Sequence, residues 1–141
     1  MSATGSTERP TSVRRAAACL WASAAVALAL TAIQLLGMVQ VPDTVAATVI
    51  GLLSAGFLAL MAAKLAAGRR WALWLFAIVY VIGTLGTLVS AIVIPQAFLS
   101  QPALLQASTI LQFGLQTVAM FLIFTSTARQ WFKVGHATTA P

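Results

Sequence analysis

The stretch LLQASTILQFGLQTVAMFLIFTST, residues 104–127, decides how this chain folds. It is long enough to cross a bilayer as a helix, because about 20 predominantly apolar residues span the hydrocarbon core. At 100° per residue, its strongly polar side chains fall within an arc of about 120° on one side of the helix: Gln106, Thr109, Gln112 and Gln116. Hydrocarbon solvates amides and hydroxyls poorly, so this polar side is predicted to face protein.

The composition places the chain in a membrane. Hydrophobic residues make up 60% of its 141 residues and charged residues only 7%, whereas about 25% of the residues in a soluble domain are charged. A single domain is expected at this length. The net charge of +6 does not indicate nucleic-acid binding, because the Lys and Arg residues lie in three short segments beside apolar runs. The single cysteine, Cys19, excludes an intrachain disulfide.

Four apolar helices are predicted, over residues 16–40, 44–67, 71–94 and 103–127. They form a transmembrane domain over 16–133, between a disordered cytoplasmic tail over 1–15 and a flexible cytoplasmic tail over 134–141. Asp43 is expected to cap the second helix at its start, and Gly68 is expected to end it. The short links make consecutive helices antiparallel neighbours. The predicted fold class is therefore all-α, a four-helix transmembrane bundle that runs up-down-up-down.

Small side chains recur along the first two helices. The first helix has a 4-3-4-3 spacing that favours close antiparallel packing, at Ala18, Ala22, Ala25, Ala29 and Ala32. The second has small residues four apart, which let another backbone approach closely, at Ala47, Gly51, Ala55, Ala59, Ala63 and Ala67. We call this second row the helix-packing seam. It is interpreted either as packing within the chain or as an interface between copies.

The charges predict the orientation. All the basic residues fall on one side of a four-span protein: Arg9, Arg14, Arg15, Lys64, Arg69, Arg70, Arg129 and Lys133. The two opposite links contain none, and the positive-inside rule therefore places both termini in the cytoplasm. Trp71, Trp74 and Trp131 join the basic residues in a cytoplasmic rim. Anionic lipids are expected partners of this rim, at ~1 kcal/mol per charge.

Two polar residues on other helices match the last helix in depth. At ~1.5 Å per residue, Gln34 and Thr109 both lie roughly 9 Å to the outer side of the span centres and Gln112 roughly 4–5 Å, so Gln34 is predicted to contact Thr109 or Gln112. By the same measure, Tyr80 is predicted to pair with Gln116. Gln34, Tyr80 and the four residues of the last helix form a polar intramembrane stripe. The stripe either supplies interhelical hydrogen bonds or lines a space for a neutral solute, a lipid headgroup or a partner helix.

Catalytic and cofactor chemistry is not indicated. No ionisable residue lies in the middle of a predicted span, which argues against a proton-coupled or cation-coupled transporter. The only histidine, His136, lies in the C-terminal tail, so a haem held within the bundle is not expected. Phosphate-binding glycine loops and the HExxH and GxSxG motifs are absent from the sequence. We therefore expect no enzyme activity, no cofactor and no metal site.

Two short motifs carry a resemblance to a protein group. Gly68-Arg69-Arg70-Trp71-Ala72 opens the third helix, and Ser126-x-x-Arg129-x-Trp131-Phe132 closes the fourth. In these motifs the chain resembles small four-span bacterial inner-membrane proteins of unknown function. The resemblance implies a multi-pass protein of the bacterial cytoplasmic (inner) membrane, with both termini inside, and it carries over no catalytic residue.

Two hypotheses about function remain. The leading one is a non-enzymatic membrane protein that acts through helix–helix association, either as a homo-oligomer or with a larger membrane partner. The alternative is a small oligomeric channel or transporter for a neutral solute. They differ at Gln112 and Gln116, because association predicts dry, paired amides and transport predicts amides that line a cavity.

Overall fold

The structure is a computed structural model that describes residues 10–39, 41 and 43–125. The described residues form five helices and no strand: α1 (Thr11–Leu35), α2 (Thr44–Ala66), α3 (Arg70–Val93), α4 (Pro95–Leu99) and α5 (Ala103–Ile123). Apart from α4, each is long and apolar enough to cross a membrane. The prediction of an all-helical chain with four apolar spans is confirmed. The short helix α4, in the link between α3 and α5, was not predicted.

Both ends of α1 differ from the prediction. The helix begins at Thr11, directly after Pro10, so residues 11–15 of the predicted disordered tail are helical, and it stops at Leu35 instead of residue 40. Gly37 has a φ of +70°, a left-handed conformation that glycine adopts without strain. Its N–H donates to the carbonyl of Gln34, and the N–H of the next residue donates to the carbonyl of Ile33. This Schellman motif satisfies carbonyls that the helix leaves unpaired and turns the chain towards α2.

Both predicted ends of α2 are confirmed. The Asp43 carboxylate accepts a hydrogen bond from the N–H of Ala46 at 3.0 Å, as an N-cap does. Gly68 has a φ of +74°, and its N–H donates to the carbonyl of Leu65. The tight turn that follows brings α3 back beside α2.

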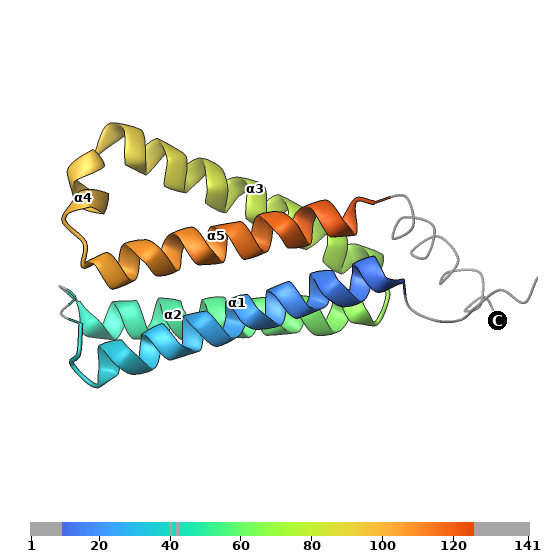
Figure 1. The fold of residues 1–141 in the computed structure, drawn as a ribbon, viewed down its shortest axis with the longest axis horizontal. Helices are drawn as coiled ribbons and strands as arrows, with labels where there is room; N and C mark the ends of the chain where they lie inside the picture. Colours follow the sequence, from blue (N-terminus) through green and yellow to red (C-terminus); the bar gives the residue numbers. More distant parts are fainter. Residues whose placement is uncertain (1–9, 40, 42, 126–141) are drawn as a thin grey trace, which may run out of the picture.

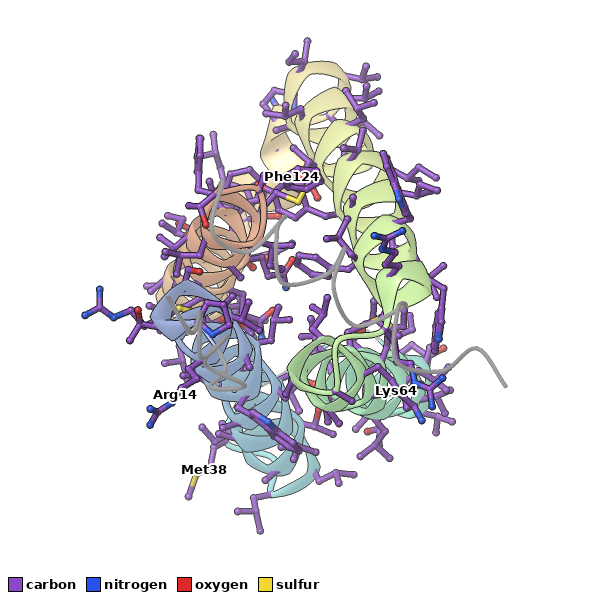
Figure 2. All side chains as sticks on the ribbon, turned by 90° about the vertical axis from the view of Figure 1, so that its right-hand side faces the viewer. Arg14, Met38, Lys64 and Phe124 are labelled. Carbon is purple, nitrogen blue, oxygen red and sulfur yellow. The ribbon has the colours of Figure 1, made fainter. Side chains whose placement is uncertain are left out.

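The long helices form a ring in the order α1, α2, α3 and α5, and successive members run in opposite directions (Figures 1 and 2). One end holds the start of α1 and the α2–α3 turn, with Arg14, Arg15, Lys64, Arg69 and Arg70. We call it the basic end. The opposite end holds the α1–α2 link and α4, and we call it the α4 end. Arg9, Arg129 and Lys133 lie outside the described residues.

The four long helices pack into one hydrophobic core near the basic end. Its fully buried members include Val13, Leu20, Met61, Leu65, Phe76, Ala119 and Ile123. α1 packs along both α2 and α5, whereas α3 joins the core only through its first turns. Over residues 81–93, α3 is exposed except at the half-buried Thr84. Figure 1 shows the result, since α3 diverges from α5 towards the α4 end.

The small-residue row predicted on the first helix points away from the other helices. Ala18, Ala22, Ala25, Ala29 and Ala32 are all exposed. The buried side of α1 instead carries Val13, Ala16, Ala17, Leu20, Ser23, Ala24, Ala27 and Thr31. Both sides are rich in alanine, so small size alone could not identify the packed side, and that prediction was wrong.

The helix-packing seam on α2 is buried only in part. Ala55 is buried and Gly51 is half-buried, but Ala63 is exposed. Ala47 and Ala59 are also half-buried, and Ala67, just beyond the helix, is exposed. Residues four apart turn by 400° along a helix, so such a row drifts by about 40° at each step. At its basic end, the row therefore does not pack within the chain, whereas an interface between copies stays a prediction.

The closest approach of α1 and α2 occurs where Thr31 meets Gly51. Thr31 is only 3% exposed, and its hydroxyl donates to the carbonyl of Ala27 at 2.9 Å. A Cβ added to Gly51 would collide with the hydroxyl oxygen of Thr31. Gly56 lies on the same helix, but a Cβ there would meet no atom within 4 Å. Only one of these two glycines is therefore required by packing.

Gly51→Ala and Gly56→Ala test this contact as a matched pair. Gly51→Ala should destabilise the protein by about 1–3 kcal/mol, because overfilling a packed contact forces neighbouring groups apart. Gly56→Ala should be neutral or stabilise by up to about 1 kcal/mol, because alanine is the better helix former. Unfolding in detergent measures both. Equal effects of the two substitutions would contradict the close approach.

Candidate functional site

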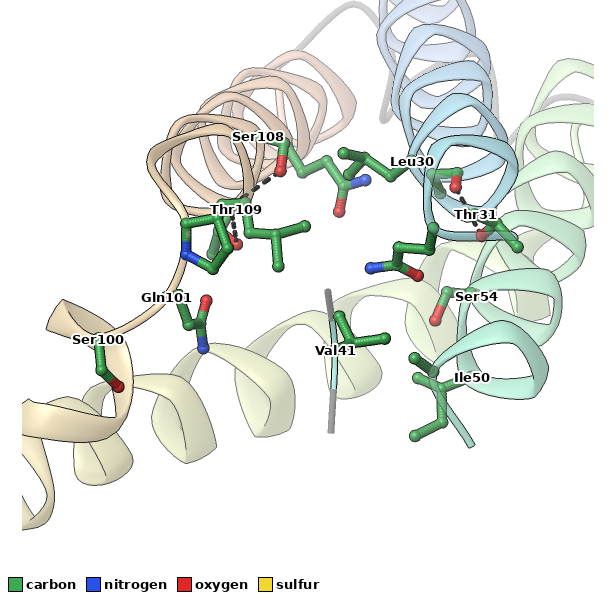
Figure 3. A pocket seen from close by; sticks show the side chains of 16 residues that line it. Leu30, Thr31, Val41, Ile50, Ser54, Ser100, Gln101, Ser108 and Thr109 are labelled. Atoms are coloured by element: carbon green, nitrogen blue, oxygen red, sulfur yellow. Dashed lines mark hydrogen bonds between the residues drawn. The ribbon is translucent and has the colours of Figure 1, made fainter. Parts of the chain in front are cut away.

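Three adjoining cavities occupy the α4 end of the ring. The first, of about 660 Å³, lies between α1, α2 and α5 (Figure 3). The second, of about 270 Å³, lies between α2, α3 and α5, and the third, of about 400 Å³, lies between α3, α4 and α5. Thr109 lines all three, and Gln112 lines the first two. We call the three together the α4-end cleft.

The first cavity is rich in uncharged polar side chains. Figure 3 shows Ser108 and Thr109 of α5 across the cavity from Thr31 of α1 and Ser54 of α2. The link after α4 adds Ser100 and Gln101. The amides of Gln34 and Gln112 also line this cavity. Amide and hydroxyl groups therefore reach this space from every element that surrounds it.

Gln34 was predicted to contact α5, and in the structure the two share a cavity. Gln34, Thr109 and Gln112 all line the first cavity. Among the residues that the structure describes, however, no hydrogen bond joins Gln34 to either of the other two. Thr109 instead donates to the carbonyl of Leu105 at 2.9 Å. Depth was thus estimated correctly, but the expected direct pairing is not found.

Tyr80 was predicted to pair with Gln116, but it pairs with the next residue, Thr117. Its hydroxyl lies 2.6 Å from the hydroxyl oxygen of Thr117. Thr117 donates to the carbonyl of Phe113 at 2.7 Å, so Tyr80 is the donor to Thr117. The ring of Tyr80 also contacts Phe76 and Phe113, with centroids 6.1 Å apart in each pair. Gln116 lines the second cavity beside this cluster, which ties α3 to α5.

The Gln106 side chain does not join the rest of the polar stripe, because it makes hydrogen bonds to the link between α3 and α5. Its side-chain nitrogen donates to the carbonyls of Phe98 and Leu99 at 3.2 Å and of Gln101 at 2.8 Å. These carbonyls belong to the end of α4 and the residues after it, where a helix leaves carbonyls unpaired; the carbonyl of Phe98 also accepts from the N–H of Gln101 at 3.2 Å. One amide thus fixes α4 to the start of α5 and satisfies backbone groups that hydrocarbon could not.

The amides of Gln34, Gln112 and Gln116 remain without a protein partner. Across residues 10–39, 41 and 43–125, none of the three side chains makes a hydrogen bond to the protein. All three are half-buried and line the cleft. An unpaired amide costs several kcal/mol in hydrocarbon. These groups therefore require a hydrogen-bonding occupant of the cleft.

Sequence reasoning missed part of the lining. Tyr80 was identified, but Gly83, Thr84 and Thr87 follow it at helical spacing and line the second cavity with it. This spacing indicates that these residues share a helix face with Tyr80, so the sequence did contain a signal for them. Ser54 lines the first two cavities, but it was not among the polar residues singled out from the sequence. The lining residues Ser100 and Gln101 lie in a link, where periodicity gives no information.

The cytoplasmic rim lies far from the cleft, at the basic end. Trp71 and Trp74 are exposed at the start of α3, close to Lys64, Arg69 and Arg70. Arg129, Trp131 and Lys133 fall outside the described residues. Within the described part of the chain, no three His, Cys, Asp or Glu side chains gather into a metal site.

No protein-family model, curated protein or solved structure matches this chain. The resemblance to small four-span bacterial proteins is therefore supported only by the four apolar helices.

A double-mutant cycle tests the tie between α3 and α5. Tyr80→Phe and Thr117→Val each remove one partner of the hydrogen bond, and their coupling energy should be about 0.6–1.7 kcal/mol, the range for such bonds in membranes. The control cycle joins Tyr80→Phe with Thr48→Val, because Thr48 only donates to the carbonyl of Thr44 on α2. Unfolding in detergent gives both values, and equal coupling in the two cycles would rule out the tie.

Proposed function

We propose that this chain is a non-catalytic, multi-pass protein of the bacterial inner membrane that binds a neutral, hydrogen-bonding molecule in the α4-end cleft, as a carrier for such a solute would. Both termini lie in the cytoplasm, and the cleft faces the outer side. This function corresponds to the transport alternative, and the cleft supports it better than helix–helix association. Anionic lipids hold the basic end at the cytoplasmic surface.

The unpaired amides carry this proposal. Gln34, Gln112 and Gln116 present both hydrogen-bond donors and acceptors to a space inside the predicted membrane spans. If they served only to join helices, they would be paired with one another. Among the described residues, no charged side chain lines the three cavities. A charged solute would therefore enter a low-dielectric site without a counter-charge, which is strongly unfavourable.

The charge distribution supports the orientation. The five described basic residues gather at one end, and Asp43 lies at the other. By the positive-inside rule, the basic end is cytoplasmic and the cleft is accessible from outside. The buried core, with Leu20, Met61 and Phe76, lies between the cleft and the cytoplasm. This arrangement suits a binding site that is open on one side, and it does not suit a continuous channel.

Helix–helix association keeps one observation in its favour. The exposed outer half of α3 includes Ile82, Leu85, Leu88 and Ile92. A second copy or a larger membrane partner could cover this surface. Lipid covers apolar side chains equally well, however, and it cannot pair with the amides of the cleft. Association therefore ranks second.

Thiol labelling tests whether the cleft is wet. In a Cys19→Ser background, Gln112→Cys should react with a water-soluble maleimide added outside intact cells, because thiolate forms only in contact with water. Gly114→Cys is the matched control at nearly the same depth. Gly114 is exposed but lines none of the three cavities, so its cysteine should face lipid and stay unreacted. If neither cysteine reacts, the cleft is dry and association takes first place.

The orientation has its own test. Gln96→Cys and Ser100→Cys lie at the α4 end, and both should be labelled from outside by an impermeant maleimide. Ala67→Cys, exposed at the basic end, should be labelled only after the cells are opened. All three positions are outside the apolar spans, so reactivity reports the side of the membrane. The reverse pattern would place the basic end outside and overturn the orientation.

A further inference from the structure

We propose that the occupant of the α4-end cleft is a neutral lipid of the diacylglycerol class, which enters sideways from the bilayer between α2 and α3. This inference rests on the proposed function and names the class of ligand. Three observations carry it: the increase in apolar lining from the first cavity to the second, the lateral gap and the absence of charge among the described lining residues.

The lining of the cleft becomes more apolar from the first cavity to the second. The first cavity, nearer the α4 end, holds the amides of Gln34 and Gln101 and the hydroxyl of Ser54. The second reaches towards the core, and its apolar walls are Phe57, Leu58, Phe76, Val79 and Phe113. Its polar lining, from Tyr80, Thr84, Thr87 and Gln116 and the residues shared with the first cavity, supplies partners for ester groups. Since Ser54, Thr109 and Gln112 line both cavities, the two are adjacent. An elongated molecule with one polar end matches this arrangement.

The apolar cavity is accessible from the bilayer. α2 and α3 are linked only by the turn at the basic end, whereas α3 and α5 are also linked by α4 at the opposite end. The outer half of α3 is exposed along its length and does not close on α2. Hydrocarbon chains of the membrane therefore have direct access to the second cavity, and a chain can lie there while its headgroup remains in the first.

The chemistry of the lining selects the headgroup. Hydroxyl and ester groups accept hydrogen bonds from the glutamine amides, and a free hydroxyl also donates to their carbonyl oxygens. A phosphate would lack a cationic partner among the described residues, because those that line the three cavities are all uncharged. The first cavity, at about 660 Å³, lies within the range of about 300–1,000 Å³ that is usual for ligand sites. Diacylglycerol offers both hydroxyl and ester groups without a charge.

Gly83 provides a specific way to block the chain-binding part. It lines the second cavity, and a Cβ there would meet no atom within 4 Å. Gly83→Leu therefore fills the apolar cavity without colliding with the backbone, and it leaves the amides in place. Gly56→Leu is the matched control, because its Cβ is equally unhindered and Gly56 lines none of the three cavities.

The experiment uses the full chain in nanodiscs of phosphatidylcholine with a diacylglycerol probe that carries a diazirine on one acyl chain. Crosslinks should map to peptides containing Phe57 or Val79. Unlabelled diacylglycerol should displace the probe, and phosphatidic acid with the same chains should be at least about tenfold weaker, the effect of about 1.4 kcal/mol. Gly83→Leu should reduce labelling by about tenfold, and Gly56→Leu should leave it unchanged.

Equal competition by phosphatidic acid, or labelling that is indifferent to Gly83→Leu, would overturn the lipid assignment. Protection of Gln112→Cys from maleimide separates the two proposals. If glycerol protects this cysteine and diacylglycerol does not, the site takes a small neutral solute, so the proposed function stands and the lipid inference fails. If Gln112→Cys never reacts and the probe never crosslinks, both fail.

Discussion

The packing of α1 against α2 at Thr31 and Gly51 is the contact on which the rest of the bundle depends. The missing side chain of Gly51 lets the two backbones approach closely, with the Thr31 hydroxyl turned back onto its own helix. α5 then packs along the other side of α1. These three helices leave α3 no partner along its outer half, so α3 joins only the core at the basic end. The cleft results from this difference in packing between α3 and the other three long helices.

A bilayer makes such an open arrangement stable. In water, the exposed apolar side chains of α3 would favour closure, at about 25 cal/mol per Å² of buried surface. In lipid that driving force is absent, because hydrocarbon chains are as apolar as the side chains. Polar groups still favour contact with protein, since hydrocarbon chains offer them no hydrogen bonds. The hydrogen bonds of Gln106 and Tyr80 therefore fix the link and the narrow part of the ring.

Sequence reasoning found the four spans, the cap at Asp43 and the stop at Gly68, because each depends on local chemistry. It placed Gln34 level with Thr109 and near Gln112, which line the same cavity, because depth is a linear function of residue number. It could not give rotation about the helix axis, which decides whether Tyr80 meets Gln116 or Thr117. The divergence of α3 was also beyond reach, because apolar surface in a membrane does not reveal whether lipid or protein covers it.

The ring contacts of Tyr80 with Phe76 and Phe113 hold α3 near one point, about which the rest of the helix can rotate. From Tyr80 to Val93 the helix is about 20 Å long at 1.5 Å per residue, so a rotation of about 10° at that point shifts the far end by about 3.5 Å. α4 transmits that displacement to the start of α5, because Gln106 holds the two together. A rotation that moves Phe76, four residues before Tyr80, by about 1 Å thus moves the far end of α3 by about 3.5 Å at the open end of the cleft.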